Sequence, residues 1–355
     1  MSAKNLKLSK YGFSILQIET KANCNMACKF CPYPIREDNK SIMDENDVFK
    51  LIDQIDPNDK NFEYVCFSQY NEPLLDSNIF KYIKYANSKK IRNLLITNAL
   101  LLNNENKRKQ IIESSPTILK ISLQTINKSK FNWSRGTELD VEDYFTRIYK
   151  LLSEIKEQPT TVNVDLACNF ISKKKKILKK ILGLSTGDFS VPDHTSQITN
   201  DLINFIKGLE KYDNYFKLDE KKIKSFLMNS SNYYIQETGL ELAPNIFVKI
   251  KPFIHGRRIS EFKPLIHNFS CEERILGVLA DGSLMPCCKT YNNDLSLGNI
   301  KTDTIQKILD KDKNKNWLYN LRTKNSKKDE ICKKCYGEPS TRGTFVRAAI
   351  EQFRN

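Results

Sequence analysis

The chain has 355 residues, of which 40% are hydrophobic and 28% are charged, and its formal net charge is +15. No run of about 18 apolar residues could span a bilayer, and no apolar segment follows the N-terminal lysines as in a secretion signal. The sequence therefore predicts a cytoplasmic protein with no membrane partner. The lysines are spread along the chain and no nucleic-acid-binding motif is present, which argues against a nucleic-acid partner. An anionic small substrate or an acidic peptide stays open.

Short apolar runs alternate with amphipathic stretches from residue 13 to about residue 192. Six strands are predicted, at residues 14–19, 64–68, 93–97, 119–124, 161–167 and 188–192. Helices are predicted between them at residues 44–55, 79–88, 107–114, 141–155 and 172–182. Because parallel strands need a crossover connection, this order predicts an α/β fold with a parallel sheet.

Polar residues follow the predicted strands at their C-terminal ends. Examples are Asn71, Glu72 and Pro73 after the second strand, and Thr97 and Asn98 after the third. Enzymes built on β/α barrels place their active sites at these ends. An open doubly wound sheet would show the same placement.

Residues 198–266 break this alternation, with helical patterns at 198–209 and 220–228 and a strand-like run at 246–250. Three domains are therefore predicted: a barrel over 1–197, an insertion over 198–266 and a C-terminal module over 267–355. The insertion is either a cap over the substrate or a peripheral packing element.

The chain has ten cysteines, and in the cytosol clustered cysteines indicate metal or redox chemistry rather than disulfides. Cys24, Cys28 and Cys31 lie close together in the sequence. Three thiolates can hold a cubane iron–sulfur cluster and leave one iron open to an exogenous ligand. A zinc site would need a fourth ligand nearby, but the next cysteine is Cys66 and the first histidine is His194.

The spacing Cys24-x3-Cys28-x-Phe30-Cys31 after a strand resembles the CxxxCxφC signature of the radical S-adenosylmethionine (SAM) superfamily, with Phe30 at the aromatic position. Asn71-Glu72-Pro73 resembles the GEP motif of that family, with Asn71 in place of the glycine, in a region where relatives hold the amino group of the cofactor. The resemblance also implies cofactor contacts by a further set of residues. They are Thr97, Asn98, Ser122, Gln124, Arg135 and Gly136.

By resemblance, the fold is a partial (β/α)6 TIM-type barrel with a small C-terminal α+β domain. The cofactors it implies are a SAM-binding [4Fe–4S] cluster and SAM itself. Reductive cleavage of SAM would give a 5′-deoxyadenosyl radical that abstracts a hydrogen atom from the substrate. The protein would orient the cofactor, aim the radical and exclude water.

Four further cysteines, Cys271, Cys287, Cys332 and Cys335, could hold zinc or a second cluster. A hairpin is predicted at 278–288 with its turn at Asp281, and a helix at 304–309. This succession resembles the auxiliary-cluster modules called SPASM and twitch. Four ligands suffice for one auxiliary [4Fe–4S] cluster, which favours the shorter twitch type. Cys287 is favoured as the ligand over its neighbour Cys288.

Cys168 and His194 are the remaining candidates for catalytic roles. Cys168 lies near the end of the fifth predicted strand and could donate a hydrogen atom, although packing is the simpler role. His194 follows the sixth predicted strand and could accept a substrate proton, or could make a structural hydrogen bond.

The leading hypothesis is a radical SAM oxidoreductase that dehydrogenates a sugar- or aminocyclitol-like small molecule, by resemblance to dehydrogenases with one auxiliary cluster. A second hypothesis is epimerisation or crosslinking of a peptide, against which only about twelve residues precede the first strand. A third is a metal-binding protein without turnover. Either enzyme would need an external electron donor such as a flavodoxin- or ferredoxin-like protein.

Overall fold

The computed structural model describes residues 6–168, 173–184, 196–229, 238–252, 262–265, 268–287, 290–324 and 328–353. The described strands form a 10-stranded sheet in the order β10-β9-β8-β1-β2-β3-β4-β5-β7-β6. The strands are β1 Ile15–Ile18, β2 Tyr64–Cys66, β3 Asn93–Thr97, β4 Ile118–Gln124, β5 Thr161–Cys168, β6 Leu240–Ala243, β7 Ile246–Pro252, β8 Ile275–Val278, β9 Ser283–Met285 and β10 Gly298–Asn299.

The sheet is parallel from β8 through β1, β2, β3, β4 and β5 to β7. β9, β10 and β6 join it in antiparallel pairs at the two ends. The described strands do not close into a ring, because β10 and β6 remain as edges. The predicted fold class, an α/β partial barrel, is confirmed.

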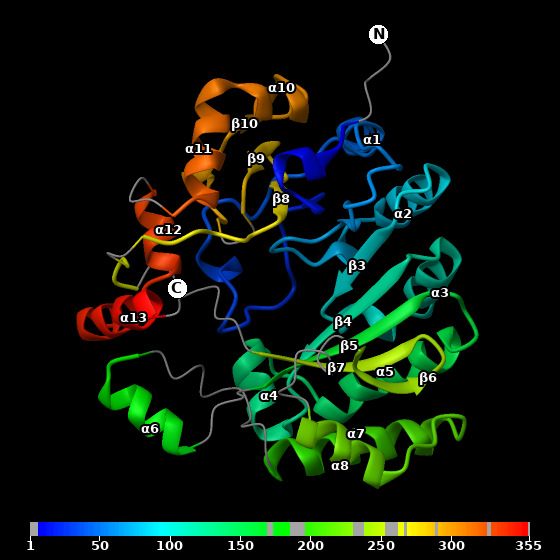
Figure 1. Cartoon of the computed structure of the whole chain (residues 1–355). Coiled ribbons are helices and arrows are strands. Elements are labelled where there is room, and N and C mark those ends of the chain that lie inside the picture. The colour runs from blue at the N-terminus through cyan, green and yellow to red at the C-terminus, as the bar shows by residue number, and fades with distance from the viewer. Residues whose placement is uncertain are drawn as a thin grey trace.

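Helices cover one face of this sheet, as Figure 1 shows. In chain order they are α1 Glu45–Asp53, α2 Ile79–Ser88, α3 Glu105–Ser114, α4 Lys128–Arg135, α5 Val141–Ile155, α7 Ser196–Tyr212 and α8 Glu220–Asn229. The sequence alternation sets this face, because successive residues of a strand point to opposite sides. In β4, Leu119, Ile121 and Leu123 are fully buried, whereas the residues between them are only half-buried. The sheet therefore presents one apolar face to the helices and a more polar inner face.

The structure places Ile246–Pro252 beside β5 in the sheet. Residues 188–192 lie outside the described residues, and the strand that pairs in parallel with β5 is β7. The strand predicted at 246–250 is confirmed, but it belongs to the sheet instead of standing in a separate insertion. Three described helices, α6 Lys173–Ile181, α7 and α8, and the strand β6 lie between β5 and β7 in the sequence, so this crossover is longer than the earlier ones. α4 was not predicted, because it is only eight residues long.

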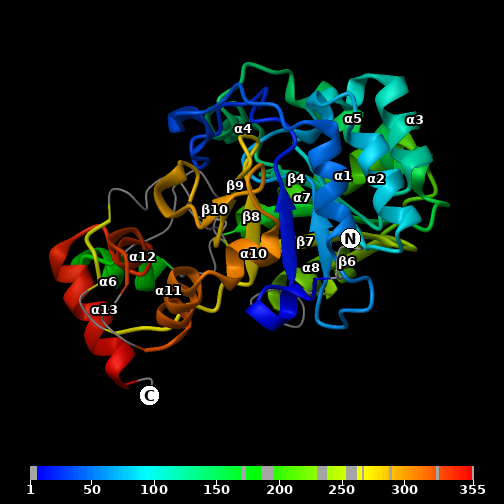
Figure 2. The same cartoon turned by 90° about the horizontal axis from the view of Figure 1, so that it is seen from above.

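The C-terminal part continues the same sheet, since β8 pairs in parallel with β1. β8 and β9 form the predicted hairpin, and Gly282 at its turn has a φ of 92°, which glycine adopts without strain. Four helices follow: α10 Ile305–Asp310, α11 Asp312–Arg322, α12 Glu330–Cys335 and α13 Thr341–Phe353. In Figure 2, α11, α12 and α13 lie on the opposite side of the sheet from α1, α2 and α3, next to α6 Lys173–Ile181.

Side-chain contacts fasten this C-terminal part to the start of the barrel. Arg322 donates to the backbone oxygen of Gly12 at 2.9 Å and to that of Glu273 at 3.1 Å. Its guanidinium also lies 5.2 Å from the ring centroid of Phe13. Within the described residues, no helix is both long and apolar enough to cross a membrane.

Candidate functional site

The first three cysteines lie on the loop that leaves β1. The backbone N–H of Cys31 donates to the backbone oxygen of Cys28 at 3.1 Å, and that of Tyr33 donates to the Cys31 Sγ at 3.4 Å. Burial raises the pKa of the Cys24 thiol to about 11 and that of the Cys31 thiol to about 12, and the neighbouring thiols add to both increases. The three thiols are thus brought together on one short loop.

Glycine at position 136 lets the end of α4 pack against this loop. Gly136 has a φ of 61°, and a Cβ there would lie 2.3 Å from the backbone oxygen of Ala27. The backbone N–H of Lys29 donates to the backbone oxygen of Ser134 at 2.9 Å, which fixes the same contact. The close approach places the preceding residue, Arg135, against the three cysteines.

Arg135 is a buried cation beside the thiols, with a relative exposure of 2%. Within the described residues its Nε and Nη2 atoms have no hydrogen-bond partner. Burial acts to lower its pKa, but the thiols of Cys28, Cys24 and Cys31 act to raise it, and the net shift is upward. Its guanidinium carbon lies 5.9 Å from the ring centroid of Phe30. A buried cation with unpartnered donors fits an anionic group at this position.

Glu72 links the loop after β2 to the loop after β3. Its carboxylate accepts from the Thr97 hydroxyl at 2.8 Å and from the backbone N–H of Asn98 at 2.7 Å. Burial raises its pKa to about 7, although these hydrogen bonds act to lower it. Asn98 in turn donates to Asn25 Oδ1 at 2.7 Å and to Cys24 Sγ at 3.7 Å. The structure therefore joins the predicted residues Glu72, Thr97 and Asn98 to the cysteine loop.

The other predicted cofactor residues make hydrogen bonds of their own that do not involve the cysteine loop. Asn71 accepts from the backbone N–H of Gln69 at 3.0 Å, and its buried Nδ2 has no partner among the described residues. Gln124 donates to the Ser122 hydroxyl at 2.9 Å, and its φ of 65° marks an irregularity between β4 and β5. Cys168 is the last residue of β5, but its side chain lies outside the described part, as does all of His194.

Two contacts near this site were not found from the sequence. Tyr144 of α5 is buried, and its hydroxyl donates to the backbone oxygen of Asn98 at 2.6 Å. Arg36 and Glu19 form a fully buried pair with contacts of 2.5 and 3.0 Å, which ties the chain after Cys31 to the end of β1. Their separation of seventeen residues follows no periodic pattern. The unusual spacing explains why sequence reasoning missed the pair.

The four C-terminal cysteines line one pocket. Cys271 precedes β8, Cys287 follows β9, and Cys332 and Cys335 lie on α12. The other residues lining this pocket are mostly apolar or aromatic: Phe269, Thr290, Leu295, Trp317, Leu321, Ile331 and Tyr336. Burial raises the pKa of the Cys332 thiol to about 12, with further contributions from Asp329 and Cys271. Cys288 lies outside the described residues.

Family models match both cysteine regions. The radical SAM superfamily model matches residues 18–168, and the SPASM model, described as an iron–sulfur cluster-binding domain, matches residues 270–336. Residues 18–168 therefore form a radical SAM domain, and residues 270–336 form a SPASM domain. The first match contains Cys24, Cys28 and Cys31, and the second contains all four residues of the C-terminal cysteine pocket. No curated protein sequence matches the chain significantly.

Solved structures with a similar fold include three radical SAM enzymes. BtrN in complex with AdoMet and 2-DOIA is 14% identical, with a TM-score of 0.50 and coverage of 90% of this chain and 92% of that chain. SuiB of Streptococcus suis bound to the precursor peptide SuiA is 16% identical, with a TM-score of 0.53 and coverage of 90% and 71%. The enzyme anSMEcpe with bound AdoMet is 15% identical, with a TM-score of 0.50 and coverage of 96% and 97%. At these identities the likeness shows the fold.

Radical SAM chemistry requires a [4Fe–4S] cluster and SAM, and SPASM domains bind auxiliary iron–sulfur clusters, so these are the cofactors of this chain. Within the described residues, no three His, Cys, Asp or Glu side chains form a group that could hold a single metal ion. The residues fit the cofactors on two other observations. The Arg135 guanidinium, whose Nε and Nη2 have no hydrogen-bond partner among the described residues, lies near enough to the three N-terminal thiols to interact with their charge, and the four C-terminal thiols line a common pocket.

Proposed function

We propose that this radical SAM enzyme is a dehydrogenase of a sugar- or aminocyclitol-like small molecule. Cys24, Cys28 and Cys31 would hold the SAM-binding cluster, and Cys271, Cys287, Cys332 and Cys335 would hold the auxiliary cluster. When bound, the clusters and SAM supply a radical that removes a hydrogen atom from the substrate, together with an acceptor for the electron left behind. An external flavodoxin- or ferredoxin-like protein would supply the electron that starts the reaction.

This chain's own residues would position the cofactor. Arg135 would offset the negative charge of the three thiolates and of the Glu72 carboxylate. The Glu72 carboxylate would accept a hydrogen bond from the amino group of the cofactor. Thr97 and Asn98 donate to this Glu72 carboxylate and would hold it in place. Phe30, Asn71, Ser122 and Gln124 complete the proposed cofactor contacts, and Asn71 is buried while the other three are half-buried.

The observation that carries the dehydrogenase proposal is the C-terminal cysteine pocket. Four thiols around one pocket can ligate every iron of a cubane cluster, whereas three leave one iron open. A cluster with no open iron suits electron transfer better than substrate coordination. An oxidation leaves a substrate radical whose electron needs an acceptor, and such a cluster would provide one. BtrN, whose fold is similar, was crystallised with a small molecule, 2-DOIA.

Peptide modification is the second candidate, because the similar fold of SuiB was crystallised with a precursor peptide. In that reaction Cys168 could return a hydrogen atom from the opposite face of the substrate. His194 would be the proton acceptor in a dehydrogenation. The third hypothesis is a protein that binds metal without turnover. It requires that the reconstituted protein does not cleave SAM.

The test is anaerobic reconstitution with iron and sulfide, then incubation with SAM, a low-potential reductant and candidate substrates in deuterated water. A dehydrogenase gives 5′-deoxyadenosine and a product two mass units lighter than its substrate. An epimerase gives a product that carries one deuterium from solvent and is not oxidised. The second result would overturn the dehydrogenase proposal, and the absence of 5′-deoxyadenosine would overturn radical SAM catalysis in this chain.

A further inference from the structure

The inner face of the sheet carries a charged cluster that the cofactor contacts do not use. It lies on three neighbouring parallel strands: Lys120 on β4, Asp165 on β5 and Lys251 on β7. In β5, Asp165 lies between the buried apolar residues Val164 and Leu166, and in β7 Lys251 follows the buried Ile250. Successive residues of a strand point to opposite faces, so the charged side chains lie on the other face from these apolar ones. The cluster therefore lies on the face opposite the covering helices.

Two ammonium groups share one carboxylate in this cluster. The Nζ atoms of Lys120 and Lys251 lie 3.6 and 3.2 Å from the same oxygen, Oδ2 of Asp165. The side chains of the two lysines are 20% and 40% exposed, so both reach solvent although they lie inside the barrel. One carboxylate can balance only one of the two charges. The cluster keeps a surplus positive charge where water is partly excluded, and an anionic ligand would compensate it.

The same face also presents acceptors without donors. Within the described residues, Oδ1 of Asp165 and Oδ1 of Asn163 are buried and have no hydrogen-bond partner. Both residues are more than nine-tenths buried, with relative exposures of 8% and 6%. Such atoms cost free energy unless a ligand or water donates to them. Hydroxyl groups are donors of the kind that would satisfy them.

One member of the cluster, Lys120, lies on the same strand, β4, as the proposed cofactor contact Ser122. Lys120 lies two residues before Ser122 on β4, and alternate residues of a strand share a face. A strand rises about 3.3 Å per residue, so Lys120 precedes Ser122 on the same face by about 7 Å. A small molecule held by the cluster would extend from it toward the cofactor.

We propose that Lys120, Asp165 and Lys251 form the substrate-recognition site, and that the substrate is a sugar-like molecule with an acidic group beside its hydroxyls. The two lysines bind the acidic group, and the free oxygens of Asp165 and Asn163 accept from hydroxyls. A cationic aminocyclitol is disfavoured because it would add positive charge to a site that already has an excess. This inference rests on the proposed function and narrows its substrate class.

The experiment uses the reconstituted holoenzyme with SAM and three probes of one scaffold: glucuronate, glucose and glucosamine, with binding followed by calorimetry. The wild type should bind glucuronate about tenfold more tightly than glucose, as a charge-assisted hydrogen bond allows, and glucosamine most weakly. Lys251→Glu should reverse the order of glucuronate and glucosamine. Lys251→Gln should reduce the binding of glucuronate to that of glucose.

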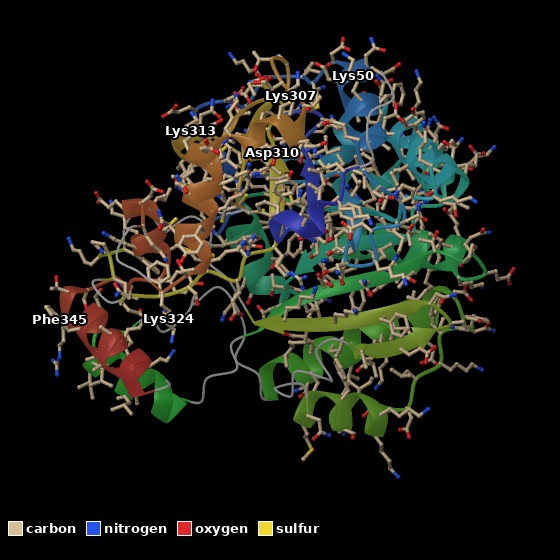
Figure 3. The ribbon with its side chains drawn as sticks, turned by 45° about the horizontal axis from the view of Figure 1, so that its top comes forward. Lys50, Lys307, Asp310, Lys313, Lys324 and Phe345 are labelled. Carbon is tan, nitrogen blue, oxygen red and sulfur yellow. The ribbon has the colours of Figure 1, made fainter. Side chains whose placement is uncertain are left out.

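A matched control is Lys313→Glu, which makes the same charge change on the exposed surface of α11 (Figure 3). It should keep the wild-type order. Equal binding of the three probes by the wild type, or the same order in Lys251→Glu and Lys313→Glu, would overturn the inference. If a variant does not fold, the wild-type order still decides. Uncoupled cleavage of SAM by the wild type is measured in parallel, so that a failure of the proposed function is distinguished from a failure of this site.

Discussion

The cysteine loop near the N-terminus and the C-terminal cysteine pocket differ in what surrounds their thiols. The loop has three cysteines beside a buried cation, Arg135, and a hydrogen-bonded network around Glu72. The pocket has four cysteines, and the other residues that line it are mainly apolar or aromatic. A polar surrounding with a missing fourth thiol suits a site that takes up a charged cofactor. An apolar surrounding with four thiols suits a closed cluster.

The sharpest test of this comparison removes one thiol from the loop. Cys28→Ala should abolish formation of 5′-deoxyadenosine from SAM, because two thiolates cannot hold the cluster that leaves one iron open. The measurement is chromatographic quantification of 5′-deoxyadenosine after anaerobic reduction. Cys66→Ala is the matched control, since Cys66 is a buried cysteine within β2. Cleavage that persists in Cys28→Ala would contradict the assignment of the loop.

The corresponding change in the pocket should have a different outcome. Cys332→Ser should lower the iron content from about eight to about four per chain and stop product formation. Cleavage of SAM without substrate should continue, because the loop is untouched. Iron counting and the 5′-deoxyadenosine assay measure the two effects separately. An unchanged iron content would show that the pocket holds no second cubane cluster.

The third prediction concerns the buried ion pair between Arg36 and Glu19, which joins the chain after the cysteine loop to the end of β1. Arg36→Met leaves the Glu19 carboxylate buried without its partner, and should lower the free energy of unfolding by about 3–5 kcal/mol. Urea denaturation of the apoprotein measures the loss. The double variant with Glu19→Gln should recover much of it, because no uncompensated charge remains. A double variant as unstable as Arg36→Met would show that the pair contributes by packing.

Glu72 gives the smallest expected effect, a change in the dependence of stability on pH. Its pKa is raised from 4.5 to about 7 by burial, so the folded state binds a proton that the unfolded state has released. Its contribution to stability is therefore full below pH 4.5 and is lost as the pH rises through 7, by up to about 3 kcal/mol. Glu72→Gln removes this pH-dependent contribution to the free energy of unfolding, because glutamine does not titrate.

The measurement is urea denaturation of the wild type and Glu72→Gln at pH 5 and pH 7.5. The advantage of the wild type over the variant should shrink as the pH rises. Glu138→Gln, at an exposed position, is the control and should follow the wild type at both pH values. Parallel curves for Glu72→Gln and the wild type would show that this carboxyl group does not titrate in the range.

Local patterns in the sequence determined much of this protein. The strand at Asn93–Thr97 and the helix at Val141–Ile155 have the predicted bounds, because apolar periodicity and their capping residues are local signals. The spacing of Cys24, Cys28 and Cys31 also lies within eight residues and could be interpreted without a fold. The place of β7 beside β5 could not be assigned in the same way, because three described helices and β6 separate the two strands in the sequence.

Only the tertiary structure decided which distant residues meet. The four pocket cysteines span residues 271–335, and the sheet and α12 bring them to one place. Arg135 reaches the cysteine loop through the close contact at Gly136, and Lys120, Asp165 and Lys251 meet because three strands lie side by side. Sequence periodicity specifies which face a residue occupies. Which residues of other elements share that space depends on strand order and packing, and neither follows from local pattern.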